Sequence, residues 1–482
     1  MITETYQVFV NKDPEKIAVT TSTEKISYSQ WHTWTNQTAN WLKSMQNEYK
    51  TVGILLPNSR HFLQVFLGAA KAGWVAVPYD VRWTTDELMK RIQLSKPDFI
   101  VTTDTLKSKH HQLAQNWFDV VDLDLAIRSF PTENIVLEKN EPFYIGFTSG
   151  TTGTPKAFIR SQKSWVASFQ CNRCDFHLDN TKHVLIPGSL FHSHFLYGAV
   201  STLYLGGSVY IMEQFTPQLT KQFLNQHPIS VLYVVPTMME AFFKSQLAVK
   251  QSIQLISSGA KWSPQSKKQI HEVFYDVQMY EFYGASETSF ITVLSNEDAL
   301  NRPETVGKVC TGVEIQIRNQ KEETQVGKIY VRSELLIDGY ITGTNREVEM
   351  ICDAEGFATV HDMGYIDEEG YVTVIGREHN MILYGGINIF PEEIEQVLTT
   401  HECVEEAVVM GVADAYWGQM IVAIIKGNVS RLELKKHCRK VLASYKIPRK
   451  WLFVEKMPYT TSGKIARGEL LKQIECEELT YV

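Results

Sequence analysis

Nine consecutive residues, Thr148–Lys156, combine the side chains and the backbone freedom that an anion-binding loop needs. Two glycines let backbone N–H groups turn toward a ligand, five hydroxyl side chains add donors, and the final lysine adds positive charge. A Walker A loop would require GxxxxGK[ST] opening a helix, whereas here Pro155 precedes the lysine and the β-prone segment Ala157–Ile159 follows. The loop is therefore expected to cradle a polyphosphate without being a P-loop; an exposed Gly/Thr-rich linker is the alternative.

Further short motifs follow the loop in a fixed order along the chain. They are Tyr283–Glu287, Asp362–Tyr365, Gly376–Arg377, Gly385–Gly386 and Thr461–Lys464. The six segments together resemble the signature of the acyl-adenylate-forming enzymes, which include acyl-CoA synthetases, nonribosomal adenylation domains and luciferases. Leu383–Pro391 is also similar to the corresponding stretch of o-succinylbenzoate-CoA ligases. The resemblance implies an enzyme that joins a carboxylic acid to AMP from ATP and then transfers the acyl group to coenzyme A.

The resemblance also assigns residues to the nucleotide and its metal ion. Glu287 matches the family's Mg²⁺ ligand, and Thr152 is expected to assist it, since Mg²⁺ takes oxygen ligands and shares them with phosphates. Asp362 would accept hydrogen bonds from the ribose hydroxyls, and Arg377 would close over the same sugar. The other residues expected to contact ATP or AMP are Thr148, Ser149, Gly150, Thr151, Thr152, Gly153, Lys156, Ser258, Gly259, Ala260, Tyr283, Gly284, Ala285 and Ser286.

Lys464 matches the lysine with which the family stabilises the adenylation step, where its ammonium would bridge the substrate carboxylate and the phosphate. The family rotates its small domain between the two half-reactions, which places a hinge at His379, where relatives usually carry Asp or Lys. Gly385 and Gly386 would line the channel for the thiol arm, and Trp417 is a further candidate for contacting coenzyme A.

The acid is expected to be hydrophobic. Relatives that activate amino acids place an Asp in the stretch that corresponds to Pro187–His194, and no Asp occurs there. Phe191 and His192 match the aromatic gate and the catalytic histidine of acyl-CoA and aryl-CoA ligases, although His192 could also be a structural histidine. The predicted acyl pocket consists of Phe191, Phe195, Val235, Thr237, Met238 and Phe282. Three alternatives stay open: an o-succinylbenzoate-CoA ligase, an enzyme that loads an acyl carrier protein, and a nucleotide-binding or acyl-sensing protein without turnover.

The elements that must position these residues form an α/β pattern. Short apolar runs such as Val52–Leu56, Val231–Val235 and Ile253–Ile256 alternate with helix-like stretches such as Thr237–Val249 and Pro264–Phe274. This alternation predicts mostly parallel sheets flanked by helices, with ligands beyond the carboxyl ends of the strands. We expect a large AMP-binding domain over residues 1–377, a hinge at 378–380, and a small mobile α+β domain over 381–482 that carries Lys464.

Composition narrows the functional class. A length of 482 residues exceeds what one core usually supports, and a formal net charge of −7 gives no general attraction for nucleic acid. No leader and no apolar run of membrane-spanning length is evident, so a cytoplasmic protein is expected, without stable membrane insertion. The 7 cysteines do not suggest a disulfide framework. Cys171 and Cys174 form one CxxC with His177 nearby, but a structural zinc site would need more ligands at matching spacing.

Overall fold

The computed structural model spans the whole chain. It describes residues 1–113, 115–137, 142–149, 155–245, 248–258, 262, 264–320, 325–343, 346–384, 387–414, 418–460, 464–476 and 479. The chain packs as two compact units: unit 1 is Met1–Ile315 with Val331–Ala358, and unit 2 is Gln316–Tyr330 with Thr359–Val482. Residues 359–377 thus pack with the C-terminal part. The hinge predicted at residues 378–380 and the domains predicted on either side of it describe parts that move relative to each other. Both stay predictions.

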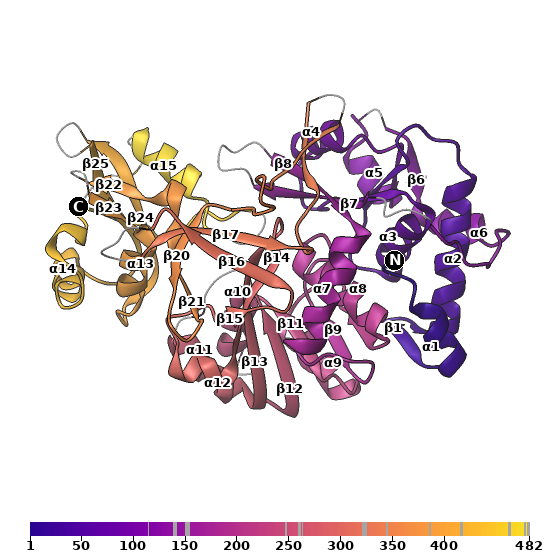
Figure 1. The fold of residues 1–482 in the computed structure, drawn as a ribbon, viewed down its shortest axis with the longest axis horizontal. Coiled ribbons are helices and arrows are strands. Elements are labelled where there is room, and N and C mark those ends of the chain that lie inside the picture. Colours follow the sequence, from indigo (N-terminus) through magenta and orange to yellow (C-terminus); the bar gives the residue numbers. More distant parts are fainter. Residues whose placement is uncertain are drawn as a thin grey trace. The chain divides into compact units, whose positions relative to one another are not determined.

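Unit 1 contains a nine-stranded sheet with the order β15-β14-β13-β12-β11-β9-β10-β1-β2. Figure 1 labels several of these strands, among them β11, β12 and β13. Its strands are β1 (Ile17–Thr20), β2 (Lys25–Ser27), β9 (His183–Ile186), β10 (Ser208–Ile211), β11 (Val231–Val234), β12 (Val249–Ser257), β13 (Phe274–Ala285), β14 (Ser289–Ser295) and β15 (Lys308–Val309). The strands from β13 to β1 run parallel, while β2, β14 and β15 pair antiparallel at the edges. The parallel strands therefore end at one edge of the sheet, where a ligand site is expected.

A second sheet of unit 1 has eight strands in the order β19-β18-β8-β7-β4-β3-β5-β6. Its strands are β3 (Thr51–Leu55), β4 (Val75–Pro78), β5 (Phe99–Thr102), β6 (Trp117–Asp119), β7 (Pro142–Ser149), β8 (Pro155–Ser161), β18 (Gly339–Thr342) and β19 (Glu347–Glu349). β3 to β7 are parallel, and β8 turns back beside β7 as an antiparallel hairpin before pairing with β18. In this way β18, almost 180 residues downstream of β8, joins the sheet that carries the phosphate loop.

Helices connect and cover these strands. They are α1 (Tyr6–Lys12), α2 (Tyr28–Ser44), α3 (Arg60–Ala72), α4 (Thr85–Ser95), α5 (Asp104–Lys109), η1 (Val120–Asp122), α6 (Leu123–Ile127), α7 (Gln162–Cys174), α8 (Ser193–Leu205), α9 (Pro217–Gln226), α10 (Pro236–Lys244), α11 (Pro264–Val273) and α12 (Asn296–Asn301). Several begin at side-chain caps; Ser27, for example, forms a capping box with Gln30 at the start of α2. α3 is buried over most of its surface, as its run of apolar residues requires.

Two smaller sheets are formed wholly or mostly by unit 2; residues 313–315 of β16 and 331–333 of β17 are counted with unit 1. One has the order β16-β17-β20-β21 and is formed by β16 (Val313–Arg318), β17 (Gly327–Ser333), β20 (Asp362–Ile366) and β21 (Val372–Arg377). The other is formed by β22 (Ile382–Tyr384), β23 (Ile387–Ile389), β24 (Val404–Asp414), β25 (Gly418–Gly427) and β26 (Lys450–Phe453). The helical segments are η2 (Glu378–Asn380), α13 (Pro391–Thr399), α14 (Arg431–Arg439), η3 (Ser444–Lys446) and α15 (Arg467–Glu475).

The predicted fold class is confirmed: a large α/β region is followed by a smaller α+β region. One predicted helix ends early. The helix expected over Thr237–Val249 stops at Lys244, because Val249 already pairs with Phe274 in the sheet. In the described ranges, no helix combines the length and the apolar character that crossing a membrane would require.

Candidate active site

The predicted phosphate loop joins the two arms of an antiparallel hairpin in unit 1. Thr148 on β7 lies opposite Lys156 on β8, and Ser149 lies opposite Pro155. The second arm contains Ala157–Ile159, the β-prone segment that the sequence predicts after the loop. The predicted contacts at Gly150, Thr151, Thr152 and Gly153, and with them the metal-assisting role of Thr152, lie outside the described residues.

Lys156 and Glu287 are brought together by a residue that the sequence analysis missed. The Nζ atom of Lys156 lies 5.1 Å from the centre of the Tyr340 ring, which is a cation–π arrangement. The Tyr340 hydroxyl donates a hydrogen bond of 2.6 Å to Oε1 of Glu287. Pairing of Tyr340 with Phe158 across β18 and β8 places it there. A cation and a carboxylate therefore share one tyrosine beside the phosphate loop.

The turn that carries Glu287 is fixed by close packing of its backbone. A Cβ atom at Gly284 would lie 1.8 Å from the backbone oxygen of Ser289, so only glycine fits there. The backbone oxygen of Glu287 accepts a hydrogen bond of 2.9 Å from the N–H of Ile337. The turn is thus held on both sides, and the Glu287 side chain projects from a rigid support.

Arg160, on β8, forms hydrogen bonds that hold the same turn. Its guanidinium donates to the backbone oxygens of Ser286 and Leu335 and to Oγ of Ser289, each at 2.9 Å. The residue is 1% exposed, and burial lowers its pKa to about 10. These contacts tie β8 to the Glu287 turn and supply the donors that its buried carbonyl groups need.

Two of the residues predicted to contact ATP or AMP lie at the ends of neighbouring strands. Ser258 directly follows β12, and Tyr283 lies near the end of β13. Ser257 is paired with Glu281 in the parallel register of these strands, which sets Ser258 and Tyr283 at the same sheet edge. Ala285 and Ser286 continue from Tyr283 into the Glu287 turn. Gly259 and Ala260 lie outside the described residues.

Part of the predicted acyl pocket forms one aromatic group. The His194 ring lies 4.9 Å from that of Phe195 and 5.5 Å from that of Phe282, measured between ring centres. Met238 and Val235 pack against the same hydrophobic cluster. Nε2 of His194 donates to the Val234 oxygen at 3.1 Å.

Two other members of the predicted pocket lie differently. Thr237 is exposed at the start of α10. Phe191 packs on Trp83, with 4.8 Å between ring centres, in a separate cluster that also contains Phe147 of the phosphate-loop strand. Phe191 therefore packs beside β7, the strand that leads into the phosphate loop, and its roles as gate and pocket residue stay predictions.

His192 follows Phe191 and has polar neighbours. Nε2 of His192 lies 3.3 Å from Nη2 of Arg82, and Arg82 forms a salt bridge with Asp80. Burial lowers the pKa of His192 to about 4, so the ring is neutral at physiological pH. Neither Arg82 nor Asp80 was expected from the sequence.

The predicted ribose residues meet in unit 2. Asp362 on β20 and Arg377 on β21 are direct cross-strand partners, and Nε of Arg377 donates to Oδ1 of Asp362 at 3.0 Å. Asp362 is 5% exposed, whereas the Arg377 side chain is 48% exposed. The carboxylate is thus held in place while the guanidinium reaches the surface of the unit.

Lys464 closes a tight turn in unit 2 and is exposed. Its backbone oxygen accepts from the N–H of Thr460 at 2.7 Å, and its N–H donates to Oγ1 of Thr460 at 3.2 Å. Tyr459 and Ile465 form a β-bridge that completes the turn. The backbone of Lys464 is therefore anchored on Thr460, while its side chain is exposed.

The predicted hinge residue His379 lies in η2. Its ring centre is 4.7 Å from that of His361, and His361 is 3.2 Å from Oε2 of Glu378. Lys328 also reaches Glu378, at 2.8 Å. The predicted coenzyme A residues Gly385, Gly386 and Trp417 lie outside the described residues.

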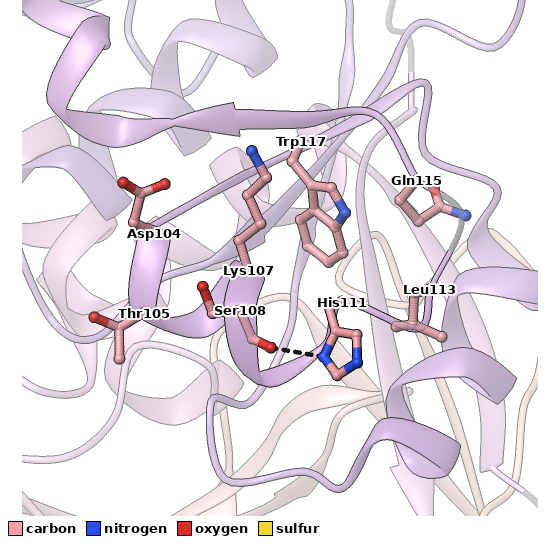
Figure 2. A pocket seen from close by; sticks show the side chains of 8 residues that line it. All are labelled: Asp104, Thr105, Lys107, Ser108, His111, Leu113, Gln115 and Trp117. Atoms are coloured by element: carbon pink, nitrogen blue, oxygen red, sulfur yellow. Dashed lines mark hydrogen bonds between the residues drawn. The ribbon is translucent and has the colours of Figure 1, made fainter.

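A surface pocket of about 690 Å³ is lined by other residues (Figure 2). Its lining residues, Asp104, Thr105, Lys107, Ser108, His111, Leu113, Gln115 and Trp117, come from α5, the following turn and the edge strand β6. None of them is a predicted site residue.

Comparison with known proteins adds independent information. The family model "AMP-binding enzyme" matches residues 6–341, and "AMP-binding enzyme C-terminal domain" matches residues 393–464. The uncharacterized acyl-CoA ligase YhfT of Bacillus subtilis (strain 168) is 44% identical over 492 aligned positions, covering 100% of this chain and 99% of that protein. A 2-succinylbenzoate-CoA ligase of Oceanobacillus iheyensis is 29% identical, covering 87% of this chain and 88% of the relative.

A solved structure has the same fold. The o-succinylbenzoate CoA synthetase of Bacillus subtilis, in complex with its acyl-adenylate intermediate, superposes with a TM-score of 0.86 at 25% identity. The alignment covers 96% of this chain and 97% of that one.

Proposed function

The chain belongs to the AMP-binding enzyme family, and from that premise we propose that it joins a hydrophobic acyl or aryl carboxylic acid to coenzyme A. It is an AMP-forming acid–thiol ligase, and its reaction uses ATP, Mg²⁺ and coenzyme A. In the first half-reaction a carboxylate oxygen attacks the α-phosphorus of ATP and pyrophosphate leaves. In the second, the thiol sulfur attacks the acyl carbon, AMP leaves and the thiol proton is released.

The observation that carries this proposal is the group formed by Lys156, Tyr340 and Glu287. Oε1 of Glu287 accepts from Tyr340, and within the described chain Oε2 forms no hydrogen bond. A carboxylate with one oxygen anchored and the other available fits a hard cation such as Mg²⁺. Bound there with ATP, Mg²⁺ would neutralise phosphate charge. Lys156 lies near the start of β8, in the hairpin that carries the phosphate loop, and supplies a further positive charge for the polyphosphate.

We assign the other adenylation roles to unit 2. Asp362 would accept from the ribose hydroxyls, since it is a buried carboxylate that Arg377 holds in place. Lys464 would stabilise the negative charge that accumulates between carboxylate and α-phosphate. The exposed, anchored turn that carries Lys464 supports this role.

We assign the thiol half-reaction to a second arrangement of the small domain. His379 would be the pivot, and Gly385, Gly386 and Trp417 would contact the pantetheine arm. Free coenzyme A is the expected acceptor. Loading of an acyl carrier protein is the alternative, and parallel assays with each thiol would separate the two. We also propose a cytoplasmic location, where ATP and coenzyme A are supplied.

For the acid, an aromatic dicarboxylate is the second candidate. It is supported by the likeness to o-succinylbenzoate CoA synthetase and by the aromatic group around His194. The deciding experiment is a screen of fatty, aryl and dicarboxylic acids for coenzyme A-dependent AMP release by the full-length enzyme. Acid-dependent AMP release supports the proposal. An absence of acid-dependent ATP–pyrophosphate exchange across the whole panel would refute the ligase assignment and favour a binding protein without turnover.

A further inference from the structure

Asp80 and Arg82 lie between β4 and α4 and form a closely held ion pair. Asp80 is 1% exposed, and its Oδ2 accepts from Nη2 of Arg82 at 2.6 Å. Nε of Arg82 lies 2.9 Å from Oδ1 and 3.1 Å from Oδ2, and the Arg82 backbone N–H donates to Oδ1 at 2.9 Å. A guanidinium gripped by two parallel hydrogen bonds has a fixed plane, so the direction of its other donors is fixed as well.

One of those donors points at His192. Nη2 of Arg82 lies 3.3 Å from Nε2 of the imidazole. Arginine carries only donors, so Nε2 must be the acceptor and must lack a proton. A neutral imidazole then carries its proton on Nδ1. No other described residue forms a hydrogen bond with this ring, which leaves Nδ1–H as the group that a ligand can meet.

The backbone of His192 is equally constrained. It is the N-terminal cap of α8, and its carbonyl accepts from the N–H groups of Phe195 and Leu196, each at 3.1 Å. Its own N–H donates to the Ser189 oxygen at 3.0 Å. The backbone of His192 is therefore held in place, and the contact with Arg82 is the interaction that orients its ring nitrogens.

Aromatic packing places this histidine beside the phosphate loop. Trp83, next to Arg82, has its ring 5.9 Å from Phe147 on β7 and 4.8 Å from Phe191. β7 runs directly into the loop, and Phe191 precedes His192. The ion pair, the histidine and the root of the phosphate loop thus form one continuous packed group within unit 1.

We propose that Arg82, clamped by Asp80, is a positioning residue that fixes His192 as the neutral tautomer with its proton on Nδ1. His192 then acts as a hydrogen-bond donor to an oxygen of the carboxylate or the acyl-adenylate. Nε2 is occupied and does not take up a proton, so the thiol proton released in the second half-reaction leaves by another route. The kinetic part of this inference rests on the proposed ligase reaction, whereas the tautomer does not.

The tautomer can be measured without any assay of activity. In full-length enzyme labelled with ¹⁵N-histidine, the ring nitrogens of His192 are assigned by comparison with His192→Asn. We expect the shift pattern of an Nδ1–H tautomer near pH 7, and partial conversion to Nε2–H in Arg82→Met. A wild-type ring protonated on Nε2 would overturn the inference even if the enzyme proves to be a ligase, and this readout needs no folded variant of Arg82.

A double-mutant cycle tests whether Arg82 acts through His192. We expect Arg82→Met to lower kcat for adenylation roughly 10- to 100-fold with little change in the KM for ATP, as loss of an oriented donor does. In the His192→Asn background the same change should cost less than about 2-fold, because the coupled partner is gone. Arg91→Met is the matched control, since Arg91 also packs on Trp83, 3.9 Å from the ring centre, without contacting His192. Equal losses in both backgrounds would contradict the positioning role.

Discussion

The hydroxyl of Tyr340 donates a 2.6 Å hydrogen bond to Glu287, the carboxylate that we propose as the Mg²⁺ ligand. Removing a hydrogen-bond partner of a metal ligand usually lowers metal affinity or activity 10- to 100-fold, because the ligand loses its orientation. We therefore expect Tyr340→Phe to raise the Mg²⁺ concentration for half-maximal pyrophosphate exchange about 10-fold. Titration of Mg²⁺ measures this directly. Tyr275→Phe, at an exposed tyrosine, is the control, and an unchanged Mg²⁺ midpoint in Tyr340→Phe would argue against Glu287 as the ligand.

Sequence patterns predicted the parts of this site that lie within single segments. The hairpin arms around the phosphate loop could be predicted, because a β-prone stretch stands on each side of the glycines. The positions of Asp362 and Arg377 on either side of a turn could be predicted as well, and they are cross-strand partners. In each case the information is local, since one hairpin fixes its own register.

Other parts depend on contacts between distant segments. Tyr340 reaches Glu287 only because β18 pairs with β8, and nothing in the Gly339–Thr342 segment specifies that partner. Arg82 and Arg160 are cations that would ordinarily be assigned to the surface. Their acceptors, His192 and the carbonyls of the Glu287 turn, lie more than 100 residues away in sequence. Long-range pairing of this kind is set by the whole fold, so single motifs do not reveal it.

Arg160 should matter for stability as well as for activity. It is buried, and it satisfies two backbone carbonyls and a hydroxyl around the Glu287 turn. Lysine cannot reproduce this fork of donors, so Arg160→Lys leaves buried acceptors without a partner. We expect the free energy of unfolding to fall by about 2–4 kcal/mol. Chemical denaturation monitored by tryptophan fluorescence would test this. The exposed Arg332→Lys should change stability by less than about 0.5 kcal/mol, and equal effects would show that Arg160 is not structurally required.

Lys71 on α3 should make the stability of the folded protein depend on pH. It is 1% exposed, its Nζ has no hydrogen-bond partner among the described residues, and burial lowers its pKa to about 8. Between about pH 8 and the unfolded value near 10.5, the unfolded chain binds more protons, so stability rises with pH there. Below pH 8 the full cost of burying the ammonium remains, about 3 kcal/mol. Lys71→Met should therefore stabilise the protein at pH 7, and its advantage should shrink toward pH 10.

Equilibrium unfolding of both proteins at each pH would measure the Lys71 effect. Lys43→Met, at an exposed position on α2, is the control and should show no pH-dependent difference. His32 supplies a second readout, because Lys71 contributes, after burial, to lowering its pKa to about 4. The His32 pKa should rise in Lys71→Met. A constant stability difference from pH 7 to pH 10 would mean that the Lys71 ammonium is not penalised by burial.

Asp362 should control recognition of the ribose. The carboxylate is held by Arg377 and would accept from the sugar hydroxyls, so it should favour ATP over 2′-deoxy-ATP and 3′-deoxy-ATP. We expect Asp362→Asn to raise the KM for ATP at least about 10-fold, as loss of a charge-assisted hydrogen bond does. Discrimination against the deoxynucleotides should shrink in the same variant. Steady-state pyrophosphate-exchange kinetics with the three nucleotides measure the KM for ATP and the preference for ATP over the deoxynucleotides. If Asp362→Asn kept the wild-type preference, the ribose would have to bind elsewhere.

Lys464 should matter for only one of the two half-reactions. Its turn is anchored by Thr460 and by the bridge between Tyr459 and Ile465, so replacing the exposed side chain should leave the fold intact. We expect Lys464→Ala to lower acid-dependent ATP–pyrophosphate exchange about 10²- to 10³-fold, the usual effect of losing a charge that stabilises a transition state.

The thiol half-reaction should be almost unaffected by the same substitution. Transfer from supplied acyl-adenylate to coenzyme A should proceed at close to the wild-type rate in Lys464→Ala, because thiol attack does not require the lysine at the phosphate. Single-turnover measurements of each half-reaction separate the two effects. Lys456→Ala removes another exposed lysine of unit 2 and should leave both rates within about 2-fold of wild type. Equal loss of both half-reactions in Lys464→Ala would show that the lysine supports the whole active site, and its assignment to the adenylation step would then be wrong.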